Sequence, residues 1–127
     1  MHGSLRTCFC AACKKKYHMA DVDLQPPVPI CKNCGGKLRP DIVWFGEVPY
    51  HMERIYKILE HMDYLMVVGT SGIVYPAAGF LSIAIQTGAY TIGVNFEEPR
   101  NASMIDEFHR GKAGEILPGL VEGWIGQ

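Results

Sequence analysis

The sequence predicts an α/β fold: a partial parallel sheet of about three strands with helices, accompanied by a small cysteine-rich module. Two observations predict this fold. All five cysteines of the 127-residue chain fall between Cys8 and Cys34, in a segment with too few apolar residues to form a core. From Arg39 onward, short β-rich segments alternate with segments of helical periodicity, which is typical of parallel strands joined by helices.

Three apolar segments are predicted as buried strands: IVWF at 42–45, YLMVVG at 64–69 and YTIGVNF at 90–96. After Pro49, apolar residues recur at helical spacing and predict an amphipathic crossover helix that contains Met52, Ile55, Tyr56, Leu59 and Met62. An Ala-rich segment over 76–87 predicts a second helix, which ends before Gly88. A last helix is predicted to start at Pro118 and to bury Leu120, Val121, Trp124 and Ile125.

Charge and hydropathy exclude some classes of partner. The formal net charge of −1 gives no general electrostatic reason to expect nucleic acid. No charged residue occurs from Tyr64 to Phe96, but Pro76 and several glycines interrupt this stretch. It is therefore predicted as several buried elements and not as a membrane helix, and we expect a cytoplasmic protein.

Four cysteines form two CxxC pairs, Cys10 with Cys13 and Cys31 with Cys34, at a spacing typical of a structural zinc ribbon. Each pair places two thiolates on one tight turn, and Gly35-Gly36 allows the second turn to form without Cβ clashes. Four protein ligands leave no open position for water, so the zinc is expected to be structural. Free thiols or redox pairs are the alternative.

Other residues of this segment have weaker claims to a role. Cys8 is predicted as a small, partly buried hydrophobe, and His18 could replace a cysteine, although four thiolates already satisfy the metal. The run Lys14–Lys16 is predicted as a solvated face that offsets the negative charge of a tetrathiolate centre. A zinc-ribbon nucleic-acid binder would rest on this run alone.

A glycine-containing turn follows the strand predicted at 64–69. Such a turn lies at the carboxyl end of its strand, where α/β sheets bind ligands, and the hydroxyls of Thr70 and Ser71 can donate to phosphate oxygens. The next strand ends in GVNFEE, so Asn95 and Glu97 fall at the neighbouring carboxyl end, where they can hydrogen-bond ribose hydroxyls. The two turns together favour a nucleotide site over an ordinary turn and a surface acidic pair.

Several segments resemble, in order along the chain, those of sirtuins, the NAD-dependent protein lysine deacylases: HGS, CxxC, CxxC, LRPDIVWFGE, GTSGIVYPAAGF, GVNFEE and GKAGEILP. The resemblance covers essentially the whole chain, and LRPDIVWFGE is most similar to the branch of bacterial sirtuins and the mitochondrial desuccinylase. It implies a Rossmann-like sheet, a structural Zn²⁺ and NAD⁺ as co-substrate. It also implies a His-Gly catalytic segment at 1–4, a zinc ribbon at 5–38 and the C-terminal half of the NAD-binding domain at 39–127.

The resemblance implies an activity and roles for individual residues. The acyl group of a lysine would pass to ADP-ribose with release of nicotinamide, and His2 would be the catalytic base. The acylated lysine peptide would pair with the segment Val43, Trp44, Phe45, Gly46 and Glu47. The adenosine half of NAD⁺ would be lined by Gly69, Thr70, Ser71, Asn95, Glu97, Lys112 and Ala113.

In sirtuins the His-Gly pair lies well inside the domain, so we expect this chain to start in the middle of that domain. The family's GAGxS loop and QNxD motif are missing upstream, and a mis-called start, a split gene or a deliberate truncation would each produce such a chain. In a split enzyme, a partner polypeptide would supply the two motifs. We expect the isolated chain to be inactive, with His2 untethered, and to be poorly stable or to associate. The alternative is a non-catalytic, zinc-containing module that binds NAD or ADP-ribose. The acyl-chain preference is left open.

Overall fold

A computed structural model describes residues 1–25 and 27–126 of the chain. The chain divides into two compact units, Met1–Glu53 and Arg54–Gln127, which are described separately below. The change in composition near Leu38 falls inside the first unit, because the strand that begins at Leu38 pairs with the N-terminal strand.

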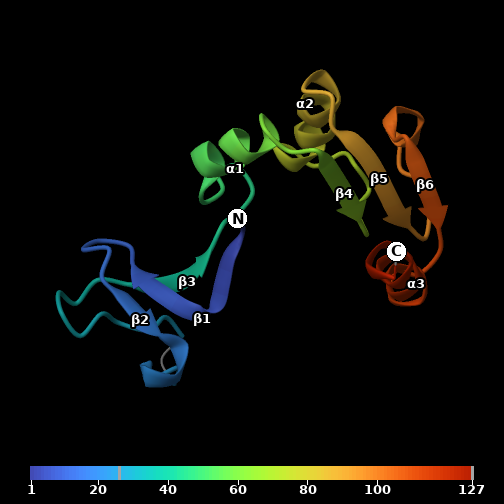
Figure 1. The fold of residues 1–127 in the computed structure, drawn as a ribbon. Helices are drawn as coiled ribbons and strands as arrows, with labels where there is room; N and C mark the ends of the chain where they lie inside the picture. The colour runs from blue at the N-terminus through green and yellow to red at the C-terminus, as the bar shows by residue number, and fades with distance from the viewer. Residues whose placement is uncertain (26, 127) are drawn as a thin grey trace. The chain divides into compact units, whose positions relative to one another are not determined.

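The first unit contains an antiparallel sheet of three strands in the order β2-β1-β3 (Figure 1). Its strands are β1 (Gly3–Cys10), β2 (Lys16–His18) and β3 (Leu38–Ile42), and a short 3-10 helix, η1 (Met19–Asp21), follows β2. The register pairs Phe9 with both Lys16 and Arg39. A small core of Cys8, Cys10, Cys31 and Leu38 is covered by Tyr17, Met19 and Val22. This core is small because the segment has few large apolar residues.

The prediction that residues 42–45 form a strand of the parallel sheet is wrong. Ile42 is the last residue of β3, whose partner is β1, and Val43–Phe45 lie outside the strand. The chain turns directly after β3, where the backbone amide of Glu47 donates to the carbonyl of Trp44 (3.0 Å). Apolar character alone does not reveal that this segment ends in an exposed turn.

The second unit contains a parallel sheet of three strands in the order β4-β5-β6, so the predicted α/β class is confirmed. Its strands are β4 (Tyr64–Val68), β5 (Tyr90–Asn95) and β6 (Glu107–Arg110). The first two were predicted, whereas β6 was not. The sequence of β6 is EFHR, which is short and carries charges, so it lacks the apolar run of a buried strand.

Three α-helices accompany this sheet in the described part of the chain: α1 (Met52–Leu59), α2 (Phe80–Gln86) and α3 (Ala113–Ile125). Two short 3-10 helices are η2 (Ala77–Gly79), directly before α2, and η3 (Ala102–Met104). The first predicted helix is confirmed as α1 except that Met62 lies beyond its end, and the segment predicted as a helix over 76–87 forms η2 and α2. Tyr56 of α1 packs edge-on against Phe80 of α2, and the hydroxyl of Thr87 donates to the carbonyl of Leu59 (3.2 Å).

The predicted start and burial of the last helix are wrong. Helix α3 begins five residues before Pro118, because the amides of Glu115 and Ile116 already donate to the carbonyl of Lys112 (2.9 and 3.1 Å). Only Leu120 is half-buried among the four residues predicted as core, and Val121, Trp124 and Ile125 are exposed. Helix α3 contacts β5.

The helices within residues 1–25 and 27–126 give no support for a membrane-spanning segment. None of the helices there has both the length and the apolar character that crossing a bilayer requires.

Candidate zinc and nucleotide sites

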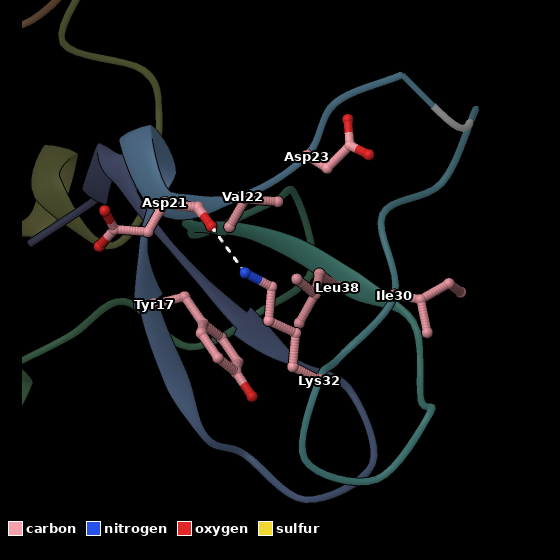
Figure 2. A pocket seen from close by; sticks show the side chains of 7 residues that line it. All are labelled: Tyr17, Asp21, Val22, Asp23, Ile30, Lys32 and Leu38. Atoms are coloured by element: carbon pink, nitrogen blue, oxygen red, sulfur yellow. Dashed lines mark hydrogen bonds between the residues drawn. The ribbon is translucent and has the colours of Figure 1, made fainter.

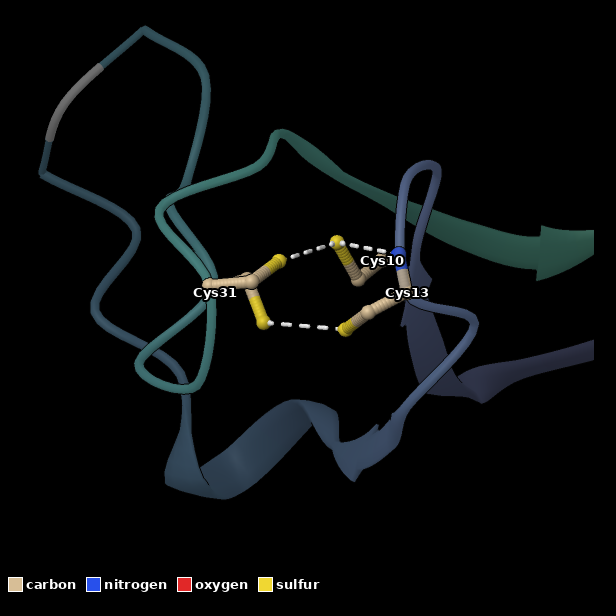
Figure 3. A group of neighbouring side chains, drawn as sticks. Cys10, Cys13 and Cys31 are labelled. Carbon is tan, nitrogen blue, oxygen red and sulfur yellow. Dashed lines mark hydrogen bonds between the residues drawn. The ribbon is translucent and has the colours of Figure 1, made fainter.

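The four cysteines of the CxxC pairs meet at one point in the first unit, as predicted. Their Sγ atoms all lie within 4.8 Å of one another, with Cys10 3.5 Å from Cys34 and Cys13 3.7 Å from Cys31. Figure 3 shows the sulfurs of the labelled cysteines directed toward a common centre. A tetrahedral zinc with Zn–S bonds of about 2.3 Å places sulfurs about 3.8 Å apart. The cluster therefore fits a structural Zn²⁺.

Two tight turns hold the cysteines. In the first, the amide of Lys14 donates to the carbonyl of Cys10 (3.0 Å), and in the second the amide of Gly35 donates to the carbonyl of Cys31 (2.9 Å). Gly35 has a positive φ of 72°. A Cβ on Gly36 would stand 2.8 Å from the Cys10 sulfur, so the backbone at 36 approaches the cluster as closely as glycine allows.

A hydroxyl supports one of the sulfurs. The Tyr17 hydroxyl lies 3.0 Å from the Sγ of Cys31. This hydrogen bond favours the thiolate and lowers the pKa of Cys31 to about 6, which suits a metal ligand. His18 lies outside the cluster, because its Nδ1 accepts from the amide of Ala20 (3.3 Å). Cys8 is buried, as predicted, and burial raises the pKa of its thiol.

A small cavity of about 160 Å³ adjoins the second cysteine turn. Figure 2 shows Val22, Ile30 and Leu38 along it, with Lys32 reaching toward Asp21. The Lys32 ammonium donates to the carbonyl of Asp21 (3.4 Å) and so links the second turn to η1. We therefore regard this cavity as part of the scaffold around the zinc site.

The predicted nucleotide residues gather at the carboxyl edge of the parallel sheet in the second unit. Gly69 follows β4 with a positive φ of 63°, and its amide donates to the carbonyl of Val94 in β5 (3.0 Å). The side-chain amide of Asn95 donates to the carbonyls of Thr70 (3.0 Å) and Glu97 (2.7 Å). Asn95 thus joins the two turns that the sequence predicted to act together.

The start of α3 belongs to the same edge. The amide of Gly111 donates to the carbonyl of Asn95 (2.9 Å), which brings Lys112 and Ala113 next to the end of β5. Lys112 is the N-cap of α3 and Ala113 is its first residue. A helix N-terminus presents free amides and a positive dipole end, which favour anionic groups such as phosphate. The edge therefore offers backbone donors, two hydroxyls, an ammonium and a carboxylate.

The predicted catalytic and peptide-binding residues lie beside each other in the first unit. The carbonyl of His2 accepts from the amide of Val43 (2.9 Å), and the carbonyl of Met1 accepts from the amide of Tyr50 (2.9 Å). The expectation of an untethered His2 is therefore wrong, because backbone hydrogen bonding between the two segments extends to His2, the residue before the first residue of β1. His2 itself is exposed.

Two charged residues around this segment were missed. Arg39 binds the carboxylate of Glu47, and the buried Asp41 accepts from Thr7, Lys16 and Tyr50. The sequence held one signal for Arg39, which is the opposite charge of Glu47. It was missed because the turn between these two residues was not predicted. Asp41 carries no comparable signal, because Lys16 is distant in sequence.

Comparison with known proteins gives a consistent picture. A sequence profile of the Sir2 family matches residues 1–76. The NAD-dependent protein deacylase 2 of Pyrobaculum aerophilum is 43% identical over 124 residues, which is 96% of this chain and 49% of that protein. The chain thus spans about half the length of the curated relatives that it matches.

Solved structures agree. A Sir2 homologue mutant in complex with ADP-ribose is 38% identical with a TM-score of 0.89, covering 96% of this chain and 50% of that one. A structure described as Sir2 bound to acetylated peptide is 28% identical with a TM-score of 0.90, covering 97% and 54%.

The four-cysteine module and the glycine turn on a parallel sheet define a class of protein that combines a structural zinc site with a Rossmann-like sheet. Within that class, the chain belongs to the Sir2 family, the sirtuins.

Proposed function

We propose that this chain carries the peptide-binding and adenosine-binding parts of an NAD-dependent protein lysine deacylase. The observation that supports this most directly is the junction at Asn95, which ties the turn after β4, the turn after β5 and the start of α3 to one sheet edge. Its relatives are named NAD-dependent protein deacylases. The reaction would transfer the acyl group of a lysine to ADP-ribose with release of nicotinamide.

The carboxyl edge of the sheet would hold the adenosine half of the dinucleotide. Thr70 and Ser71 would donate their hydroxyls to phosphate oxygens, and the first amides of α3 with the Lys112 ammonium would add positive potential. Glu97 would accept from ribose hydroxyls. Gly69 allows the backbone to approach the ligand, since position 69 carries no Cβ.

His2 would act as the base. The dinucleotide supplies the ribose that accepts the acyl group and the nicotinamide that leaves. The imidazole of His2 would take the proton from the attacking ribose hydroxyl, because imidazole is the side chain that most often acts as a general base. The hydrogen bond from Val43 to the His2 carbonyl holds this backbone next to the 43–47 segment, where the acyl-lysine would enter.

The acyl-lysine peptide would pair in extended form with the backbone of Val43–Glu47. Strand addition of this kind takes its affinity from main-chain hydrogen bonds. Trp44 and Phe45 are exposed at 53% and 97%, so both rings are accessible to a partner in the described first unit.

A second polypeptide would complete the sheet. Among the described residues, β4 pairs only with β5, so its outer edge offers backbone groups to another strand. The face beside it has an open cavity of about 460 Å³, lined by Tyr64, Met66, Tyr90, Ile92, Glu107 and Trp124. The partner we propose for this edge is a polypeptide that carries the GAGxS and QNxD motifs.

A reconstitution assay tests this function. The chain is mixed with a separately produced polypeptide that carries the GAGxS and QNxD motifs, and NAD-dependent deacylation of an acetyl-lysine peptide is measured. We expect negligible turnover by the chain alone and recovery in the mixture. Recovery should be lost in His2→Ala and kept in Cys8→Ser. Recovered activity that is indifferent to His2→Ala would contradict the proposal.

A second candidate function is a non-catalytic module that binds ADP-ribose. One observation favours this candidate: the proposed adenosine edge is built from residues of this chain, so ADP-ribose binding there would need no second polypeptide. Calorimetric titration of the chain alone with ADP-ribose tests it. Binding without turnover in the mixture would support this candidate, and turnover in the mixture would exclude it.

A further inference from the structure

We propose that Arg39 is a positioning residue, which acts through Glu47 to fix the 43–47 turn in the shape that an acyl-lysine peptide pairs with. The proposal rests on the peptide-binding function proposed above. It assigns to Glu47 a role inside the protein and leaves the backbone of the turn as the surface for the peptide.

The guanidinium of Arg39 and the carboxylate of Glu47 form a two-point ion pair. Nη1 of Arg39 donates to Oε1 of Glu47 (2.5 Å), and Nη2 donates to Oε2 (2.9 Å). This pairing holds the pKa of Glu47 down at about 2, so the carboxylate is charged at physiological pH. Planar two-point pairs fix geometry as well as charge, and a lysine cannot reproduce them.

The same two side chains close the turn at both ends. Oε2 of Glu47 also accepts from the backbone amide of Trp44 (3.0 Å), and the amide of Glu47 donates back to the carbonyl of Trp44 (3.0 Å). Nη2 of Arg39 donates in addition to the carbonyl of Ile42 (3.0 Å), the last residue of β3. Arg39 therefore connects the end of the strand to the far end of the turn.

Two aromatic rings hold the guanidinium in place. Its central carbon lies 4.3 Å from the centroid of the Trp44 ring and 5.2 Å from that of Phe9. Phe9 stands opposite Arg39 in the register of β1 and β3. Contacts of this kind are favourable between a cation and a ring face. The turn is thus anchored to the sheet through one side chain.

This arrangement decides what the turn can offer to a peptide. Both oxygens of Glu47 accept from donors of the protein, so its carboxylate has a role in holding the turn itself. The tip carries Phe45, almost fully exposed, and Gly46 with a positive φ of 88°. A turn that is already ordered loses less entropy when the peptide binds.

Hydrogen exchange of the zinc-loaded full chain is the first measurement. In Arg39→Lys and in Glu47→Gln, we expect the amides of Trp44 and Glu47 to exchange about tenfold faster than in the wild type, as for loss of one charge-assisted hydrogen bond. Zinc content shows that each variant is folded. The matched control is Lys14→Gln, which removes another cation placed over Phe9 and should leave both exchange rates unchanged.

Titration with an acetyl-lysine peptide is the second measurement. We expect Arg39→Lys to weaken peptide binding about tenfold, and Lys14→Gln to leave it within twofold of the wild type. Faster exchange with unchanged peptide affinity would overturn the proposal, and so would unchanged exchange. If the wild-type chain binds no peptide, alone or reconstituted, the proposed function fails and this inference with it; the exchange data separate that result from failure of the Arg39 contact.

Discussion

Gly3 lies so close to Asp41 that a Cβ at position 3 would stand 2.0 Å from the carbonyl oxygen of Asp41. Gly3 pairs with Ile42 across the sheet and has a positive φ of 85°. The residue that follows His2 therefore has a structural reason to be glycine. It lets β1 approach β3 at the point where His2 meets Val43.

Gly3→Ala should destabilise the first unit. The added methyl group clashes with backbone at an unfavourable φ, which costs on the order of 1–3 kcal/mol. Urea unfolding of the zinc-loaded chain measures this loss. Gly119→Ala is the matched control, because nothing lies within 4 Å of a Cβ at that helical position. The control should be neutral or stabilising by up to about 1 kcal/mol. Equal stability of both variants would contradict the close approach.

Zinc removal should unfold the first unit and leave the second. The core around Cys8, Cys10, Cys31 and Leu38 is small, so binding of the metal supplies much of the folding free energy there. Metal analysis should give one zinc per chain. Chelation should abolish the folded-state NMR resonances of residues 1–42, while the resonances of β4 and β5 persist. A chain that keeps all its folded resonances without zinc would disprove this.

Gly36→Ala should weaken zinc binding more than Gly35→Ala. A methyl group at position 36 would meet the Cys10 sulfur at 2.8 Å, whereas nothing lies within 4 Å of a Cβ at position 35, where only the positive φ is unfavourable. Competition with a chromogenic chelator ranks the two affinities. The reverse order would show that the second turn can shift away from the metal.

Asp41→Asn should remove a pH-dependent part of the stability. The hydrogen bonds from Lys16 and Tyr50 lower the pKa of Asp41 in the folded state below the ordinary value of 3.8. Its contribution is therefore present above that value and is lost as the pH falls through the folded-state pKa. At pH 7 the substitution should cost about 1–3 kcal/mol. The difference from wild type, measured by urea unfolding between pH 7 and 3, should shrink toward acid pH. A difference that is constant with pH would contradict it.

The sheet face beside Tyr64 should promote association of the isolated chain. Tyr64 and Trp124 are exposed at 69% and 50%, beside an edge of β4 that has no partner strand among the described residues. Sedimentation velocity should show species larger than a monomer, with a share that rises with concentration. The double variant Tyr64→Ser and Trp124→Ser should reduce the share of these larger species. A monodisperse monomer across the concentration range would disprove this prediction.

The zinc site was predictable because CxxC spacing is a local chemical signal, and its four ligands met as expected. The strands β4 and β5 were predictable for a similar reason, since buried parallel strands are continuous apolar runs. The segment at 42–45 has the same apolar character but ends in a turn. That turn depends on Arg39 and Glu47, whose side chains compete with strand pairing through hydrogen bonds that periodicity does not register.

The sequence did not predict β6 or the true start of α3, because the local residue types in both places favour another interpretation. EFHR is polar for a strand, and it is stabilised by its neighbours: it pairs with β5, and His109 and Glu107 contact each other through their side chains. Pro118 suggested a helix start because proline is favoured in a first turn. The helix instead begins at Ala113, where Lys112 supplies the first carbonyl acceptor.

The bonds of Asn95 all go to main-chain atoms: its side chain reaches the carbonyls at positions 70 and 97, and its own carbonyl receives the amide of Gly111. The side chains at 97 and 112 can therefore be exchanged without breaking these bonds, whereas the hydroxyl oxygen of Thr70 also accepts from the amide of Gly72 (3.2 Å) and so supports the turn. The chemistry offered to a ligand and the rigidity of its support are separately adjustable at this edge. Positions 97 and 112 can thus be varied to change which nucleotide is preferred, while Asn95 and the hydroxyl of Thr70 are kept.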